Sequence, residues 1–187
     1  MIKTYKFRIN PTEKQVEKII HTLEICRVLY NSCLLDRKNR YEQTGKSLSR
    51  MEQQKILVTD KNRIKFLNDI HSQVLQNVLF RVERAFQNFF RRVKTGEKAG
   101  YPRFKNEGRY DSITYPQESA FQITGQGLKL SKIGTIKIKL HRPIIGIVKT
   151  CTIKREIDKW YTCFSVEYEP IKKPASGRFV GIDVGIK

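Results

Sequence analysis

The sequence has few of the residues that build disulfide frames or zinc sites, with four cysteines and three histidines among 187 residues. No two cysteines stand at C-x-x-C spacing, so we expect Cys26, Cys33, Cys151 and Cys163 to be reduced thiols, mostly in the core. Long apolar runs are also missing. Without a stretch of about 18 apolar residues or a signal-peptide layout, the sequence predicts a cytoplasmic protein with no membrane partner.

Acidic residues are scarce beside basic ones, because 18 Asp and Glu face 37 Lys and Arg and leave a net charge of +19. Self-repulsion at this charge opposes folding, which favours a polyanionic partner. Nucleic acid is the first candidate, and no feature points to a small-molecule substrate. The sequence leaves the oligomeric state open.

Two kinds of element follow one another along the chain. Alternation over residues 2–9 predicts a half-buried strand with a basic outer face. A capping box at Thr12–Gln15 begins a helix that Gly45 ends, and a second box at Ser49–Glu52 begins a shorter helix to about residue 58. An apolar stripe predicts the longest helix over residues 72–94.

A polar stripe on another face of this longest helix carries three arginines, two amides and no acid. It comprises Asn77, Arg81, Arg84, Asn88 and Arg91. Such a stripe is usually a solvated surface, but an ordinary solvent face mixes both signs of charge. We therefore expect a nucleic-acid face, with Arg81, Arg84 and Arg91 on phosphates and Gln73, Gln76 and Asn77 near base edges.

The segment over residues 94–110 interleaves cations with Tyr101 and Phe104 between helix breakers. Cations with aromatics in a loop suit phosphate contact and base stacking, although we expect Phe104 to fill the core instead. The residues predicted to bind nucleic acid are Gln73, Gln76, Asn77, Arg81, Arg84, Arg91, Arg92, Tyr101, Arg103, Lys105, Lys137 and Lys139.

From residue 112 onward the pattern becomes β, with five or six short runs that Gly, Pro or Asp separate. This indicates an α+β protein with a small basic barrel or sandwich. The opening strand has no local partner, so we expect it to pair with these later strands and the helices to be an insertion. Lys137 and Lys139 alternate with apolar residues and either contact RNA backbone or solubilise the strand.

The last residues place Asp183 inside an apolar run flanked by Gly181 and Gly185. A buried carboxylate needs a partner or a metal. The run is either a C-terminal edge strand with Asp183 in a turn or the first strand of a nuclease domain.

Five motifs in this order resemble the N-terminal half of the TnpB family, the insertion-sequence OrfB transposases. They are YKFRINPT at 5–12, CRVLYN at 26–31, AFQNFFR at 85–91, YPRFK at 101–105 and VGIDVG at 180–185. The resemblance implies a wedge-type β-barrel interrupted by a helical recognition domain, then an RNase H-like RuvC domain. The implied boundaries are 1–10 and 100–170 for the barrel, 11–99 for the helices, 171–178 for a linker and 179–187 for the start of RuvC.

The resemblance also implies an RNA-guided DNA endonuclease whose partners are a guide RNA and target DNA. Asp183 matches the first RuvC carboxylate, a ligand of the catalytic divalent metal, Mg²⁺ in the family. A two-metal site needs several oxygen ligands, and the family's other carboxylates and its zinc cysteines fall outside these residues. We therefore expect binding without cleavage. The alternative is a nuclease-dead module, either an RNA-guided repressor or a general RNA-binding protein.

Overall fold

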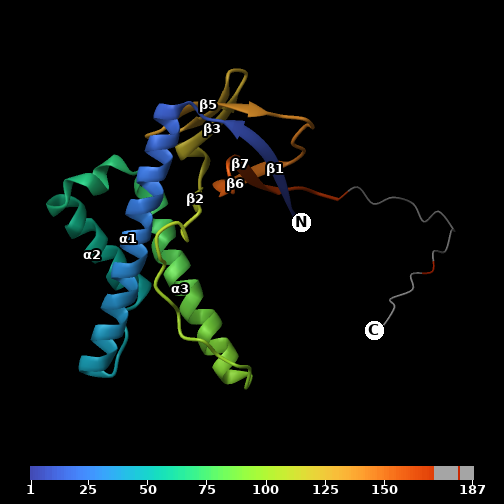
Figure 1. Cartoon of the computed structure of the whole chain (residues 1–187). Helices are drawn as coiled ribbons and strands as arrows, with labels where there is room; N and C mark the ends of the chain where they lie inside the picture. Colours follow the sequence, from blue (N-terminus) through green and yellow to red (C-terminus); the bar gives the residue numbers. More distant parts are fainter. Residues whose placement is uncertain (171–180, 182–187) are drawn as a thin grey trace.

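The computed structural model describes residues 1–170 and residue 181 (Figure 1). Asp183 and the expected linker over 171–178 lie outside the described residues, as does the expected start of a nuclease domain over 179–187 apart from Gly181. No described helix is both long enough and apolar enough to cross a membrane.

Three long helices follow the first strand. They are α1 (Glu13–Thr44), α2 (Arg50–Arg63) and α3 (Ser72–Lys94), with a short 3-10 turn, η1 (Lys65–Asp69), before α3. The capping boxes form as predicted, because the Thr12 backbone N–H donates to the Gln15 side chain at 3.0 Å and the Ser49 N–H donates to Glu52 at 2.9 Å. Gly45 ends α1 in the left-handed conformation that glycine adopts freely, with φ of 68°.

The second helix runs further than the sequence predicted, to Arg63 rather than to about residue 58. Its last turn carries Lys61 and Arg63, whose charges suit the negative end of a helix dipole. The Ile64 backbone N–H then bonds to the Asp60 carbonyl at 2.7 Å and completes the end of the helix. The two basic residues of this last turn are visible in the sequence, but the polar composition of the segment did not indicate a helix.

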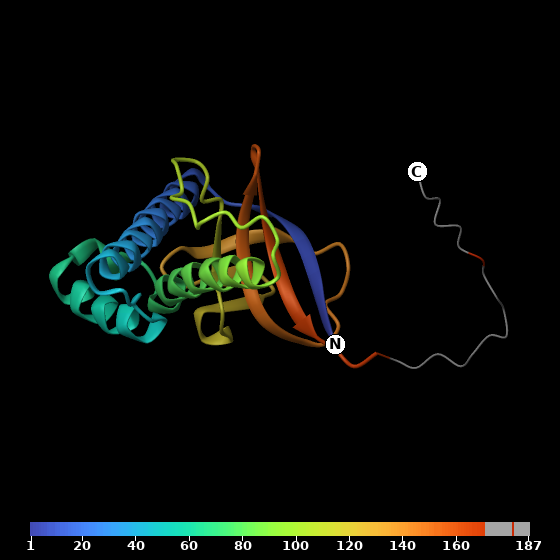
Figure 2. The same cartoon turned by 90° about the horizontal axis from the view of Figure 1, so that it is seen from below.

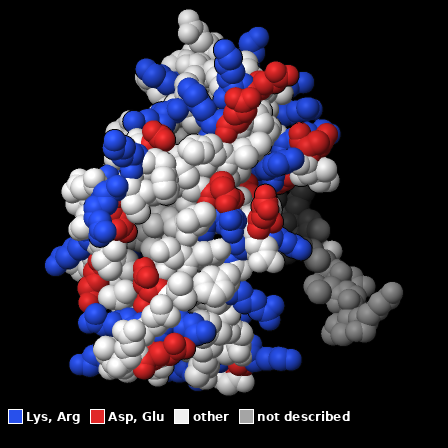
Figure 3. Space-filling model, turned by 60° about the vertical axis from the view of Figure 1, so that its left-hand side comes forward, with Lys and Arg blue, Asp and Glu red and all other residues white. Residues whose placement is uncertain are grey.

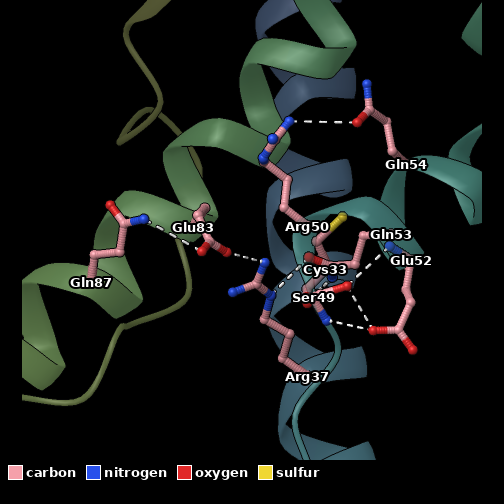
Figure 4. Close-up of polar contacts among 9 residues, drawn as sticks. All are labelled: Cys33, Arg37, Ser49, Arg50, Glu52, Gln53, Gln54, Glu83 and Gln87. Atoms are coloured by element: carbon pink, nitrogen blue, oxygen red, sulfur yellow. Dashed lines mark hydrogen bonds and ion pairs between the residues drawn. The ribbon is translucent and has the colours of Figure 1, made fainter.

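A buried arginine holds the three helices together (Figure 4). The guanidinium of Arg37 on α1 is 4% exposed, donating to Gln53 of α2 at 2.8 Å and to Glu83 of α3 at 2.7 Å. The Gln53 amide in turn donates to the Cys33 carbonyl at 2.7 Å. Because each polar group here has a partner, the network fixes the helices at a defined spacing.

The remaining elements form one antiparallel sheet of seven strands in the order β2-β6-β7-β1-β5-β4-β3. The strands are β1 (Ile2–Asn10), β2 (Ser112–Tyr115), β3 (Phe121–Thr124), β4 (Gly127–Leu130), β5 (Gly134–Lys139), β6 (Ile147–Glu156) and β7 (Lys159–Glu167), and a short 3-10 turn, η2 (Glu118–Ala120), lies before β3. The α+β class is confirmed.

The opening strand pairs with later strands, as predicted, because β1 lies between β5 and β7 in the sheet. The helices therefore leave the sheet after β1 and the chain returns to it at β2. The sheet is curved, with the helices to one side of it (Figure 2). The two edge strands of the sheet are β2 and β3, and the strand order does not pair them with each other, so closure into a barrel stays a prediction.

Candidate nucleic-acid interface

Charge alone does not locate a binding surface on this molecule. On the face shown in Figure 3, Lys and Arg side chains are scattered mainly around the margins with Asp and Glu side chains among them, and other residues occupy much of the centre. Cations without an acidic partner are more informative, because their mutual repulsion has no internal compensation.

One group of such cations lies on the outer face of the sheet. Lys137 and Lys139 on β5 are exposed and flank the half-buried Ile138, as the alternation predicted. The register places Arg8 of β1 directly opposite Lys139. On the other side of β5, it places Lys129 of β4 opposite Thr135, the residue before Ile136. Like charges directly opposite each other destabilise a sheet. We call Arg8, Lys129, Lys137 and Lys139 the sheet patch.

The sheet patch has no internal partner for its charge. Within the described part of the chain, none of its four cations lies within 4.0 Å of a carboxylate. Arg8 and Lys129 were not among the predicted site residues. The signal that identifies them is the strand register. Arg8 becomes a neighbour of β5 only through the non-local pairing of β1, and Lys129 through the local pairing of β4 with β5.

The outer face of α3 presents a second group of cations. Arg84 and Arg92 are exposed and, among the described residues, neither forms an ion pair. Arg91 is also exposed, but its guanidinium pairs with Glu97 at 3.1 Å. Because Glu97 already compensates the charge of Arg91, Arg84 and Arg92 are the stronger candidates for phosphate contact on this face.

Arg81 has a different environment from the other arginines of the predicted stripe. Its guanidinium donates to the Ser112 carbonyl at 2.8 Å and to the Thr114 hydroxyl at 3.0 Å, both on β2. It also donates to Asn77 at 3.1 Å and lies 5.1 Å from the Tyr110 ring centroid. Arg81 thus joins α3 to the sheet, and Asn77 accepts a hydrogen bond that helps to hold Arg81 in place.

A hollow of about 300 Å³ lies between α2 and the first turns of α3. Gln76, predicted to lie near base edges, lines it, and Lys61 reaches Ser72 at 2.6 Å along its wall. The lining combines four amide side chains with one cation, one hydroxyl and two apolar side chains: Gln54, Leu57, Val58, Lys61, Asn62, Asn68, Ser72 and Gln76. We call it the amide hollow. Paired donors and acceptors of this kind suit base edges.

Gln73 lies outside the amide hollow, although it belongs to the same helical turn. Its amide nitrogen donates to Gln117, and its buried Oε1 has no hydrogen-bond partner among the described residues. The carbonyl oxygen of Gln73 is therefore an open acceptor beside the η2 turn.

The loop between α3 and β2 is held through its main chain. Asn31 exchanges two hydrogen bonds with Lys105, receiving its N–H at 2.8 Å and donating to its carbonyl at 3.0 Å. Arg27 donates to the same carbonyl at 3.1 Å. The expectation that Phe104 fills the core is wrong, because its side chain is 50% exposed. The hydrogen bonds from Asn31 and Arg27 to the Lys105 main chain hold the loop instead.

The thiols and carboxylates of the described residues offer no metal centre. No group of three or more His, Cys, Asp or Glu in residues 1–170 and 181 is placed to hold a metal ion. All four cysteines are free, and burial raises the pKa of the Cys26, Cys33 and Cys151 thiols to about 12. These thiols are core groups without nucleophilic character at neutral pH.

Comparison with known proteins relates this chain to transposon proteins. Residues 1–46, which form β1 and α1, match the family model HTH_OrfB_IS605, a helix-turn-helix domain. The chain is 30% identical over 99% of its length to the "Putative RNA-guided DNA endonuclease InsQ" of Escherichia coli (strain K12). It is 27% identical over 98% of its length to a "Putative RNA-guided DNA endonuclease" of Streptomyces pristinaespiralis.

The chain spans about half the length of these curated relatives, covering 46% of each. Among solved structures, that of a Cas12f1–sgRNA–target DNA complex aligns with a TM-score of 0.47 and 15% sequence identity. That alignment covers 91% of this chain and 49% of the Cas12f1 chain.

Proposed function

Because the resemblance to the TnpB family is confirmed over nearly the whole chain, we propose that this chain is the N-terminal, nucleic-acid-binding portion of a TnpB-type RNA-guided DNA endonuclease. The observation that carries the proposal is the alignment with InsQ over 99% of the chain. In this proposal residues 1–10 and 100–170 are a wedge-type domain and residues 11–99 a recognition domain.

The surfaces divide the work between two ligands. The sheet patch holds the backbone of the guide RNA, because its four cations have no acidic partner and lie in adjacent strands. Arg84 and Arg92 hold phosphates along α3, and the amide hollow reads base edges of the DNA beside the target. Sequence recognition over the target itself is left to base pairing, which asks of the protein mainly backbone contacts.

Asp183 is proposed as the first carboxylate of the nuclease site, with a divalent metal in the complete protein. The described residues do not supply the further ligands, and one carboxylate is too few for a two-metal site. We therefore derive no cleavage step from this chain. Purified chain 1–187 is expected to bind nucleic acid and to leave DNA intact in the presence of Mg²⁺; cleavage by it would overturn this part of the proposal.

RNA selectivity tests the proposal most directly. The chain is expressed together with the DNA that follows its coding sequence, purified, and the bound RNA is sequenced. Enrichment of one structured transcript supports a guide-RNA role, whereas binding of bulk cellular RNA in proportion to abundance favours a general RNA-binding protein. Salt dependence does not separate the two, because both bind phosphates.

The amide hollow has its own test on a randomised DNA duplex library. Gln76→Ala is expected to relax discrimination at one base pair by about 1 kcal/mol or more, because a bidentate amide–base contact is lost. Gln87→Ala, a change of the same size at an exposed position of α3, is the control. Equal discrimination by wild type and Gln76→Ala would remove base reading from this hollow.

A further inference from the structure

The far end of α3 carries a cluster of aromatic rings that the functions above do not use. Phe90 is 58% exposed and Tyr101, from the following loop, is 46% exposed. Phe89 lies between them, with ring centroids 5.2 Å from Phe90 and 5.4 Å from Tyr101. We call Phe89, Phe90 and Tyr101 the aromatic platform.

The aromatic platform is supported from beneath by a buried ring. Phe86 is 6% exposed, lies 6.2 Å from Phe90 at an interplanar angle of 29°, and meets Tyr101 edge-on at 5.6 Å. Arg37, which links the three helices, lies 5.1 Å from the Phe86 ring. The exposed rings are therefore held by the core of the helical segment, and their exposure is a fixed feature of the fold.

Keeping such rings in water is costly, since burying apolar surface stabilises a protein by about 25 cal/mol per Å². Contiguous exposed apolar surface of this kind marks an interaction site. The neighbouring charges identify the partner. Four exposed cations adjoin the platform in the sequence, and none of them forms an ion pair within the described part of the chain: Arg92, Lys94, Lys98 and Arg103.

We propose that the aromatic platform stacks unpaired bases of a single nucleic-acid strand, whose phosphates lie on the adjoining cations. Exposed rings with cations close to them in the chain are the combination that single-strand binding requires, since every base has a face to stack and every linkage a negative charge. This inference rests on the proposed function and deepens it: α3 contacts duplex edges at its first turns and an unpaired strand at its last.

The test separates stacking from charge with a pair of probes. One is a fluorescein-labelled single strand of about 10 deoxyadenosines; the other has the same length and phosphates but abasic sites throughout. Wild-type chain 1–187 is expected to bind the base-bearing strand at least about fivefold more tightly, the lower limit for one stacked base.

Phe90→Ala is expected to remove this preference and leave abasic-strand binding unchanged. Phe80→Ala is the matched control, because Phe80 is 51% exposed on the same helix but its ring is covered by the Arg50 guanidinium at 4.1 Å. Tyr101→Ala provides a second variant, and thermal unfolding by circular dichroism confirms that each is folded. An equal effect of Phe80→Ala would overturn the proposal.

Equal affinity of the wild type for both strands would also overturn it, as would no binding of the base-bearing strand. The proposed function is judged separately with Lys137→Ala combined with Lys139→Ala in the sheet patch. Loss of RNA binding there, with no base preference at the platform, would leave the proposed function standing and discard the platform. Unchanged RNA binding by the sheet-patch variant, together with a base preference at the platform, would keep the platform and discard the role of the sheet patch.

Discussion

The two halves of the sheet's outer face treat their cations differently. On β6 both lysines have acidic partners, with Lys149 2.7 Å from Glu167 of β7 and Lys154 3.5 Å from Glu156. On β1, β4 and β5 the sheet patch has none, and Arg8 even stands opposite Lys139. One half therefore compensates its own charge, while the other keeps a repulsion that a bound anion would relieve.

This contrast shows why a net charge of +19 is a poor guide to a binding surface. A cation that is already engaged contributes to the fold, and its removal changes stability. A cation without a partner costs stability, and its removal changes binding. The same distinction separates Arg81 from Arg84 on α3, so it can be tested in both parts of the molecule.

The largest effect is expected at Arg81. Arg81→Ala removes charged hydrogen bonds to Ser112 and Thr114 and is expected to lower the free energy of unfolding by about 2–3 kcal/mol. Arg84→Ala, on the same helix, is expected to stay within about 0.5 kcal/mol of wild type. Urea denaturation measures both. Equal stability of the two variants would show that Arg81 is not a structural link.

The sheet patch should lose binding instead of stability. Lys137→Ala with Lys139→Ala is expected to reduce the slope of log affinity against log salt for single-stranded RNA by about 1.4, which is about 0.7 for each lost phosphate contact. Lys149→Ala with Lys154→Ala removes the same charge from the ion-paired half and is expected to change the slope much less. Equal slopes for the two pairs would show that internal ion pairing does not decide which lysines bind phosphates.

A charge reversal at Arg8 is expected to move stability and binding in opposite directions. Arg8→Glu places a carboxylate opposite Lys139 and should raise the free energy of unfolding by about 0.5 kcal/mol. It should also weaken RNA binding, because the sheet patch then compensates itself. Arg8→Gln removes the charge without reversing it, so its stability and its RNA affinity are expected to lie between those of the wild type and Arg8→Glu. A loss of stability in Arg8→Glu would show that Arg8 and Lys139 do not repel each other.

The smallest effect is expected from labelling the thiols at pH 8. Burial raises the pKa of Cys26, Cys33 and Cys151, so the native protein holds almost no thiolate at these positions. Half-buried Cys163, in register with Lys6, lies in the ion-paired half; burial raises its pKa as well, so slow labelling is expected. A mass spectrum should show Cys163 first, and modification there should leave nucleic-acid affinity unchanged.

Local signals predicted the elements well because their causes lie within a few residues. The capping boxes at Thr12 and Ser49 and the stop at Gly45 all formed. The apolar stripe of α3 became its buried face, since helical periodicity alone brings those side chains to one side. The same stripe continues into Phe90, and nothing local showed that its last turns would remain exposed.

The site was predicted less completely, because partners distant in sequence decide which cations are available. Arg81 and Arg84 belong to one polar stripe and look equivalent in the sequence. The return of the chain at β2 brings Ser112 to Arg81 and leaves Arg84 in solvent. Arg8 joined the sheet patch only through strand pairing across more than half of the chain, whereas Lys129 joined it through the short connection between β4 and β5.

The sequence by itself determined the class of fold, the excess of positive charge and the resemblance to the TnpB family, because composition, periodicity and ordered motifs are properties of the chain. Only the tertiary structure decided which cations are free, which rings are exposed and which amides share a hollow. The physical reason is that a charge or a ring becomes available for binding only when no other part of the fold satisfies or covers it, and those partners are brought together by contacts between residues far apart in the sequence.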